Sequence, residues 1–160
     1  MTLSATGTLT ADGVRFERLY DATPEELWAA ITDPEQIRGW LANVTRWSLT
    51  PGESWGLGFD DGGVDGRVVA VEPGRRLELT WIEGERAESL LSFEVLPREG
   101  GALLVLEHTR LTDESRVGFG AGWQAHLEAL DRVLRGEPEA DWWARFEELR
   151  PVYAALAPPA

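Results

Sequence analysis

The most regular apolar pattern in the chain lies in residues 118–134, near its C-terminal end. Apolar residues there recur at spacings of three and four, which at 3.6 residues per turn places them on one face of a helix. They are Phe119, Trp123, Leu127, Leu130 and Leu134. Gly136 and Pro138 follow as a typical helix end, and at about 100° per residue His126 falls inside the apolar stripe. We expect this core helix to lie against a sheet, with any ligand held between the two.

The N-terminal part predicts a strand followed by two short helices. Residues 8–20 alternate loosely between polar and apolar positions and indicate a first strand. Residues 23–26, Thr-Pro-Glu-Glu, have the composition of a capping box, and residues 33–36, Asp-Pro-Glu-Gln, repeat the device. Each should therefore begin a short helix with proline in its first turn.

From residue 44 to residue 109 the pattern changes to short apolar stretches separated by turn sequences rich in Gly, Pro and Asp. Five such turns predict an antiparallel meander of about six strands. In the later strands one set of alternate positions is apolar and should face the core helix. These positions are Leu77, Leu79 and Trp81, then Leu91, Phe93 and Val95, then Leu104, Leu106 and His108.

A second helical stripe follows the core helix. Its apolar residues are Trp142, Phe146, Leu149, Tyr153 and Leu156. Pro151 should kink or split this helix. Because the stripe is too apolar to leave in water, we expect it to lie over exposed elements of the sheet or to pack against a second subunit. No repeat or linker marks a second domain, so we predict one domain over residues 1–160, with 139–157 as a C-terminal helical extension.

Composition narrows the classes of partner and chemistry. Fifteen basic residues against 28 acidic ones give a net charge of -13, which repels phosphate backbones and anionic lipid and disfavours nucleic acid and membrane as partners. All the basic residues are arginine and cysteine is absent, which excludes Schiff-base lysines, thiol nucleophiles and thiolate metal sites. Residues 1–7 contain neither a basic leader nor an apolar segment. We expect a soluble cytoplasmic protein.

Local motifs connect the chain to a known superfamily. They are Ala22-Thr23-Pro24, Leu27-Trp28, Thr32-Asp33-Pro34 and Trp40-Leu41, then Gly66-Arg67-Val68, Glu72-Pro73, Arg76-Leu77 and Thr80-Trp81. In these motifs the chain resembles the START-like helix-grip superfamily, also called SRPBCC. Two further motifs, Leu104-x-Leu106-x-His108 and Gly122-Trp123-x-x-His126-Leu127-x-x-Leu130, are similar to the branch named for the activator of heat shock protein 90 ATPase. The resemblance covers about residues 16–134.

The resemblance implies an α+β fold in which a curved antiparallel sheet wraps around a long C-terminal helix. It also implies a cavity between sheet and helix that accepts apolar or amphipathic small molecules in relatives. The superfamily includes lipid carriers, polyketide cyclases, ring-hydroxylase subunits and co-chaperone domains, so the fold implies no single reaction.

The candidate site residues are the two histidines and the aromatic or apolar residues predicted to face the same interior. His108 and His126 are the only histidines, and both fall on inward positions. They are either a hydrogen-bonding or general-base pair or ordinary core histidines with satisfied partners, and contact with a ligand is the stronger functional interpretation. The other cavity candidates, which could equally be plain core, are Trp40, Trp55, Trp81, Phe93, Leu106 and Trp123.

Metal and cofactor sites are not expected. Two histidines would need carboxylates to complete a metal site, but Glu107 has the wrong strand parity and Glu128 is predicted on the solvent side of its helix. Residues 118–122, Gly-x-Gly-x-Gly, resemble a phosphate loop but carry Trp123 where the dinucleotide fingerprint needs its third glycine, and the chain has no lysine. We interpret these glycines as letting the helix pass close under the sheet.

Three functions follow as hypotheses. The first is non-catalytic binding of an apolar or amphipathic small molecule in the helix-grip cavity. The second is a co-chaperone-like interaction domain, with a protein partner or homodimer contact through Trp142, Phe146 and Leu149. The third is an enzyme of the cyclase, dehydratase or hydrolase type that uses His108 or His126 as acid and base. A filled interior would favour the second hypothesis, and an open one with exposed histidines would favour the first or third.

Overall fold

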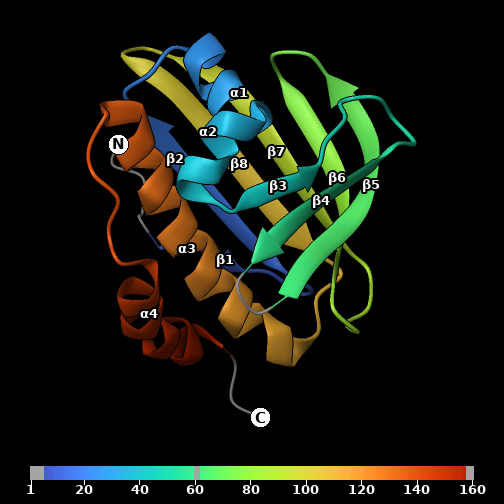
Figure 1. Cartoon of the computed structure of the whole chain (residues 1–160). Coiled ribbons are helices and arrows are strands. Elements are labelled where there is room, and N and C mark those ends of the chain that lie inside the picture. The colour runs from blue at the N-terminus through green and yellow to red at the C-terminus, as the bar shows by residue number, and fades with distance from the viewer. Residues whose placement is uncertain (1–5, 60–61, 158–160) are drawn as a thin grey trace.

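The computed structural model describes residues 6–59 and 62–157. Its strands are β1 (Thr8–Leu9), β2 (Val14–Tyr20), β3 (Asn43–Arg46), β4 (Ser54–Phe59), β5 (Gly62–Glu72), β6 (Arg76–Glu83), β7 (Ser89–Arg98) and β8 (Gly101–Thr109). Its helices are α1 (Pro24–Thr32), α2 (Pro34–Trp40), α3 (Asp113–Arg135) and α4 (Trp142–Leu156). The strands form one antiparallel sheet in the order β1-β2-β8-β7-β6-β5-β4-β3, and the long helix α3 crosses the face around which the sheet curves (Figure 1). The predicted α+β helix-grip fold is confirmed.

The meander agrees with the turn pattern, since six strands lie between residues 43 and 109 in the described part of the chain. The first strand differs from its prediction. Residues 8–20 form a hairpin of β1 and β2, because the chain turns back between Thr10 and Gly13, whose backbone groups bond at 2.8 Å. A Cβ on Gly13 would lie 2.0 Å from the carbonyl oxygen of His108. Only glycine allows this close approach to β8, and alternation alone does not reveal it.

The core lies between the concave side of the sheet and α3. All nine inward positions predicted on β6, β7 and β8 are at most 4% exposed. Trp123 and Leu127 of α3 are also buried, and the ring centroid of Trp123 lies 5.4 Å from that of Trp81 and 6.1 Å from that of Phe93. The predicted faces of helix and sheet therefore meet.

Helix α3 begins five residues before the predicted start, at Asp113 rather than Gly118. The hydroxyl of Thr112 accepts a hydrogen bond from the backbone N–H of Ser115 and caps the helix. The first turn carries polar residues, so the apolar pattern does not show it. The end is as predicted, because Gly136 takes the left-handed conformation with φ 70°.

Helices α1 and α2 begin at the predicted caps. Thr23 and Glu26 form the reciprocal capping box of α1, and the carboxylate of Asp33 caps α2. Trp40 ends α2, and its indole N–H donates to the carbonyl oxygen of Ala30 at 2.9 Å. This bond ties α2 to α1 and holds the last residue of α2 beside α3.

Helix α4 packs against α3 rather than over the sheet, which corrects one of the two expected placements (Figure 1). Leu149 and Tyr153 are buried there and Trp142 and Phe146 are partly buried, whereas Leu156 is 48% exposed. Most of the stripe is therefore covered within the chain without a second subunit. Pro151 lies inside one continuous helix and does not split it. Glu147, whose carbonyl loses its helical partner, and Pro151 are both exposed, so water can satisfy that carbonyl.

None of the helices in the described ranges has the length and apolarity needed to cross a membrane.

Candidate functional site

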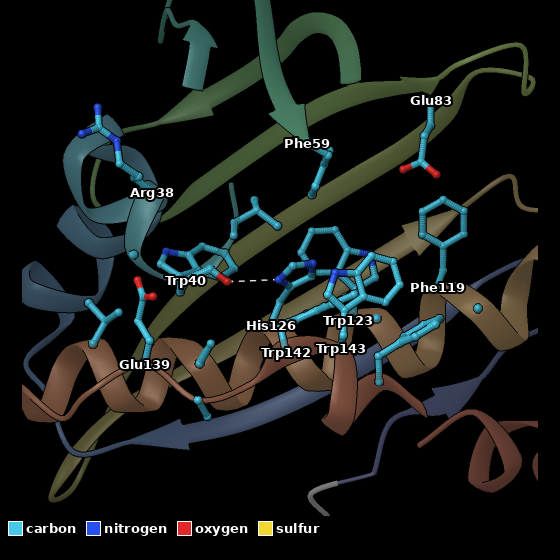
Figure 2. A pocket seen from close by; sticks show the side chains of 18 of the residues that line it. Arg38, Trp40, Phe59, Glu83, Phe119, Trp123, His126, Glu139, Trp142 and Trp143 are labelled. Carbon is cyan, nitrogen blue, oxygen red and sulfur yellow. Dashed lines mark hydrogen bonds between the residues drawn. The ribbon is translucent and has the colours of Figure 1, made fainter. Parts of the chain in front are cut away.

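A cavity of about 600 Å³, partly open to solvent, lies between α2, α3, the N-terminal half of α4 and the ends of β4, β5 and β6. Eight aromatic side chains line it besides His126. They are Trp40, Phe59, Trp81, Phe119, Trp123, Trp142, Trp143 and Phe146. Figure 2 shows Phe59 reaching in from the sheet and Trp123 and His126 from α3.

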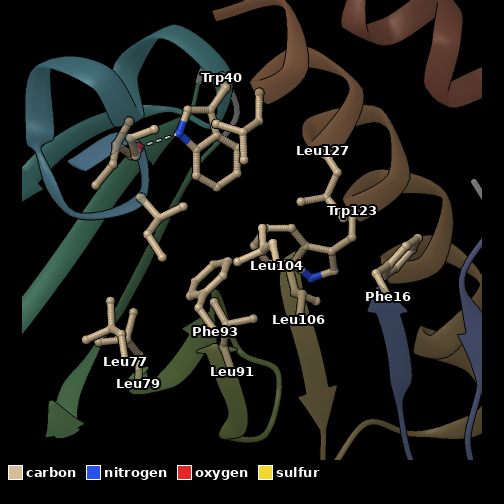
Figure 3. Close-up of a cluster of buried hydrophobic side chains, with 14 of the residues drawn as sticks. Phe16, Trp40, Leu77, Leu79, Leu91, Phe93, Leu104, Leu106, Trp123 and Leu127 are labelled. Carbon is tan, nitrogen blue, oxygen red and sulfur yellow. Dashed lines mark hydrogen bonds between the residues drawn. The ribbon is translucent and has the colours of Figure 1, made fainter. Parts of the chain in front are cut away.

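The structure divides the predicted site residues into two groups. Trp40, Trp81, Trp123 and His126 line the cavity. Trp55, Phe93, Leu106 and His108 are buried in the core beside it. Figure 3 shows Phe93 and Leu106 in this core. A second, much smaller void of about 10 Å³ lies among core residues of α1, α2, β4, β6 and β7, and this volume is about the least that holds one water molecule. This part of the core is closely packed, whereas the large cavity leaves space open beside α3, with His126 in its wall.

His108 is fully buried, and both of its ring nitrogens have partners. The indole N–H of Trp123 donates to Nδ1 at 2.9 Å, so the imidazole proton must be on Nε2. Nε2 then donates to Oγ of Ser89 at 2.7 Å, and that hydroxyl donates to the carbonyl oxygen of Trp81 at 3.1 Å. Burial lowers the pKa of His108 to about 3. This favours the interpretation of His108 as a satisfied core histidine, because neither nitrogen is free to move a proton.

His126 has a different arrangement. Its Nδ1 lies 3.0 Å from the carbonyl oxygen of Trp40, and because a carbonyl only accepts, Nδ1 carries the proton. Burial lowers the pKa of His126 to about 4, against the opposing effect of this hydrogen bond. Nε2 is consequently an unprotonated acceptor, and no group in the described ranges donates to it.

The two histidines do not form a pair. Trp123 lies between them, with its ring centroid 6.1 Å from that of His108 and 5.8 Å from that of His126. One imidazole belongs to the core and the other to the cavity wall. A mechanism that passes a proton between them has no direct route.

Two indole N–H groups in the cavity wall, those of Trp81 and Trp142, are buried without an acceptor in the part of the chain that the structure describes. By contrast, Trp40, Trp55 and Trp123 each donate to a protein acceptor. An unpaired buried donor costs about 1–3 kcal/mol. The wall of the cavity therefore contains two indole donors that the protein itself does not use.

The outer wall of the cavity is contributed by α4 and the segment before it. Arg145 holds α4 to α3 through two bonds to the carboxylate of Glu128, with Nε–Oε1 at 2.7 Å and Nη2–Oε2 at 2.9 Å. Burial alone would raise the pKa of Glu128, but hydrogen bonds from Arg145 and Gln124 outweigh it and lower that pKa. Glu128 was predicted on the solvent side of its helix. In the structure α4 covers this side, and Glu128 bonds to Arg145 of α4. Glu107 pairs with Arg15 of β2.

The three glycines of α3 face the cavity and α4. Gly118 and Gly122 line the cavity, whereas a Cβ on Gly120 would lie 2.5 Å from the ring of Tyr153 in α4. The expectation that they let the helix pass close under the sheet is wrong. Their spacing of two residues turns successive glycines to different sides of the helix, and these sides meet different neighbours.

Comparison with known proteins agrees with this geometry. Residues 21–135 match the family model described as activator of Hsp90 ATPase homolog 1-like protein. No curated protein matches the chain.

Solved structures extend the likeness to α4. The crystal structure of CalU16 from Micromonospora echinospora is 26% identical, with a TM-score of 0.77 and 96% of each chain covered. DynU16, a protein in the dynemicin biosynthetic locus, is 26% identical with a TM-score of 0.72, over 79% of this chain and 49% of its own. The Aha1 dimer from Colwellia psychrerythraea shares the fold at 20% identity and a TM-score of 0.67, over 75% of this chain and 93% of its own.

The family match covers most of the chain, from the end of β2 to the end of α3. The sheet order and the position of α3 are those of the helix-grip fold. The chain therefore belongs to the activator of Hsp90 ATPase homolog 1-like family of the START-like superfamily.

Proposed function

We propose that the protein binds an apolar or amphipathic small molecule in the cavity of about 600 Å³ and does not transform it. The observation that carries this proposal is the cavity itself, with eight aromatic side chains around a space open to solvent. Ligand sites of proteins commonly have volumes of about 300–1,000 Å³ and mostly apolar walls with few polar groups.

The chemistry of the wall supports binding over catalysis. General acid–base catalysis needs a group that can take or give a proton at the reacting atom. His108 lies outside the cavity with both nitrogens bonded. In the described residues His126 has no hydrogen-bonded carboxylate or hydroxyl that could raise its basicity. A polar group of this kind orients a ligand better than it reacts with one.

The relatives support the same proposal. DynU16 is a protein in a biosynthetic locus, a setting in which small molecules are made, and CalU16 matches this chain over nearly its full length. The family's name suggests docking on a chaperone as the alternative. The residues expected to carry such a contact are used within the chain, because Leu149 is buried and Trp142 and Phe146 form the cavity wall.

The proposal is tested by filling the cavity from α3. A Cβ on Gly122 would make ordinary contacts, 3.8 Å from Trp142 and 4.0 Å from Phe146. Gly122→Ala is therefore the matched control, and Gly122→Leu places additional atoms in the cavity. Gly118→Leu narrows the mouth at a position where a Cβ meets nothing within 4 Å.

The measurement is a titration with N-phenyl-1-naphthylamine, a neutral fluorescent probe, with denaturation curves to establish that each variant is folded. We expect saturable binding by the wild type and Gly122→Ala, and weaker binding by both leucine variants. No saturable binding to the folded wild type would reject the proposal. Equal binding by the leucine variants would show that the probe binds elsewhere.

A further inference from the structure

His126 presents one defined hydrogen-bonding group to the cavity. Trp40 is the last residue of α2, and its carbonyl oxygen belongs to the helix end that has no partner within the helix. Nδ1–H of His126 donates to this carbonyl oxygen, with 3.0 Å between nitrogen and oxygen. The bond determines the tautomer and leaves Nε2 with a lone pair and no proton.

The orientation of the imidazole is also held by its neighbours. The ring of Trp142 lies 4.9 Å from that of His126 at an interplanar angle of 30°, and the ring of Trp123 lies 5.8 Å away at 62°. Figure 2 shows the bond between the ring of His126 and the carbonyl of Trp40, with the indole rings of the cavity wall gathered beside it. Turning the ring over would break the bond to Trp40, so the acceptor character of Nε2 is a stable property of the site.

Charged groups also line the cavity, but none of them bonds to His126 within the described ranges. They are Arg38 on α2, Glu83 on β6, Arg86 after β6, Arg132 on α3, and Glu137 and Glu139 before α4. Four of these have other partners, since Arg38 pairs with Glu35, Arg86 bonds to Ser115 and pairs with Glu83, and Arg132 bonds to the carbonyl of Pro138. Nε2 of His126 itself has no proton to donate to a ligand carboxylate and repels its oxygen lone pairs.

The aromatic walls favour a flat ligand, because rings pack against one another in offset or edge-to-face contacts. We propose that the cavity selects an uncharged aromatic or polycyclic molecule with a hydroxyl group, and that this hydroxyl donates to Nε2 of His126. The inference rests on the proposed ligand-binding function and adds the chemical class of the ligand and the residue that recognises it. A molecule with the same skeleton but only an acceptor, or a carboxylate, should bind less tightly.

The test uses three molecules with one skeleton, 9-phenanthrol, 9-methoxyphenanthrene and phenanthrene-9-carboxylate, titrated calorimetrically into the full chain. One net hydrogen bond corresponds to a preference of about 3- to 10-fold. The wild type should therefore bind the phenol about 3- to 10-fold more tightly than the methyl ether, and the carboxylate least. The ether controls for ring stacking, since it loses only the donor.

Two substitutions assign the preference to Nε2. In His126→Asn the amide can still donate to the carbonyl of Trp40 but places no acceptor where Nε2 was. In His126→Gln the longer side chain returns an acceptor oxygen to that region. We expect the preference for the phenol to disappear in His126→Asn and to return in part in His126→Gln.

The outcomes separate the two proposals. Saturable binding of phenol and ether with equal affinity by the wild type would overturn the recognition by His126 and leave ligand binding intact. An undiminished preference in His126→Asn would overturn it too, because another acceptor would then be responsible. No binding of any phenanthrene, together with no binding of the neutral probe, would overturn ligand binding itself.

Discussion

The three glycines of α3 have three different surroundings, so the same substitution to alanine should have three different effects. Alanine is favoured over glycine inside a helix by about 1 kcal/mol. At Gly118 a Cβ meets nothing within 4 Å, and at Gly122 it meets Trp142 at an ordinary 3.8 Å. Gly118→Ala and Gly122→Ala should therefore each raise the free energy of unfolding by about 0.5–1 kcal/mol.

Gly120→Ala should destabilise the protein relative to both. The new Cβ would lie 2.5 Å from Cδ1 and 2.9 Å from Cε1 of Tyr153. That ring cannot yield easily, because it is fully buried and its hydroxyl accepts from the backbone of Gly7 at 2.7 Å and donates to Oε1 of Gln124 at 2.6 Å. Overpacking of this kind costs about 1–3 kcal/mol. The helix-propensity gain is common to Gly118→Ala and Gly120→Ala, so their difference is about 1–3 kcal/mol.

Urea denaturation followed by tryptophan fluorescence measures this difference as a shift of midpoint at constant slope. The same contrast should appear as about 2–4 °C in melting temperature per kcal/mol. In a Tyr153→Leu background the penalty at Gly120 should shrink, because the clashing ring is gone. If Gly120→Ala is as stable as Gly118→Ala in the parent chain, α4 does not pack on α3 as described, and the outer wall of the cavity is misplaced.

Three further predictions concern buried polar groups. Trp123→Phe keeps a ring but removes the donor to Nδ1 of His108, so denaturation should show a loss of about 1–3 kcal/mol; a loss under about 0.5 kcal/mol would contradict that bond. The pKa values are lowered to about 3 for His108 and about 4 for His126, so neither imidazole should gain a proton between about pH 8 and pH 5. A ¹⁵N NMR titration should find the proton on Nε2 in His108 and on Nδ1 in His126. A titration midpoint near pH 6.5 for either ring would refute its burial. Because the pKa of Glu128 is lowered, its ion pair with Arg145 stabilises α4 at pH values above the unfolded pKa of this carboxyl, and the stabilisation is lost as the pH falls through the folded pKa. Limited proteolysis should therefore detect faster cleavage of α4 in acid. The variant Glu128→Gln should show this faster cleavage already at neutral pH.

Much of the fold was predictable because its signals are local. A capping box at residues 23–26 and a left-handed glycine at Gly136 act through backbone groups within a few residues of themselves. The alternation in β6, β7 and β8 reports directly which side of a strand is buried. The start of α3 was missed because Thr112 caps a polar turn that has no apolar periodicity. The turn at Gly13 was missed because glycine is required there by the close contact with the carbonyl oxygen of His108, which lies almost a hundred residues away in the sequence.

The candidate site could be predicted only in part. Sequence parity places His108 and His126 alike on inward positions, and it selects Trp40, Trp81 and Trp123 together with residues that lie in the filled core. The alternation of residues shows toward which face a side chain points, but it does not show whether other side chains fill the space on that face. Whether a ring faces a cavity or a neighbour depends on how bulky side chains from several elements fit together.

Tertiary structure alone decided the chemistry of the site. The sequence does not show that the carbonyl of Trp40 accepts from His126 and so determines the tautomer of that imidazole. It also does not show that the indole of Trp123 donates to His108 and determines its tautomer. Nor does it say that α4 covers α3 and completes the cavity. The sequence by itself determined most of the elements and their buried faces, and the ends that carry a cap or a terminal glycine within the apolar pattern, since these depend on backbone geometry and local hydrogen bonds. The cavity, the free acceptor and the role of each glycine depend on contacts between residues far apart in the chain, which exist only once the elements have packed.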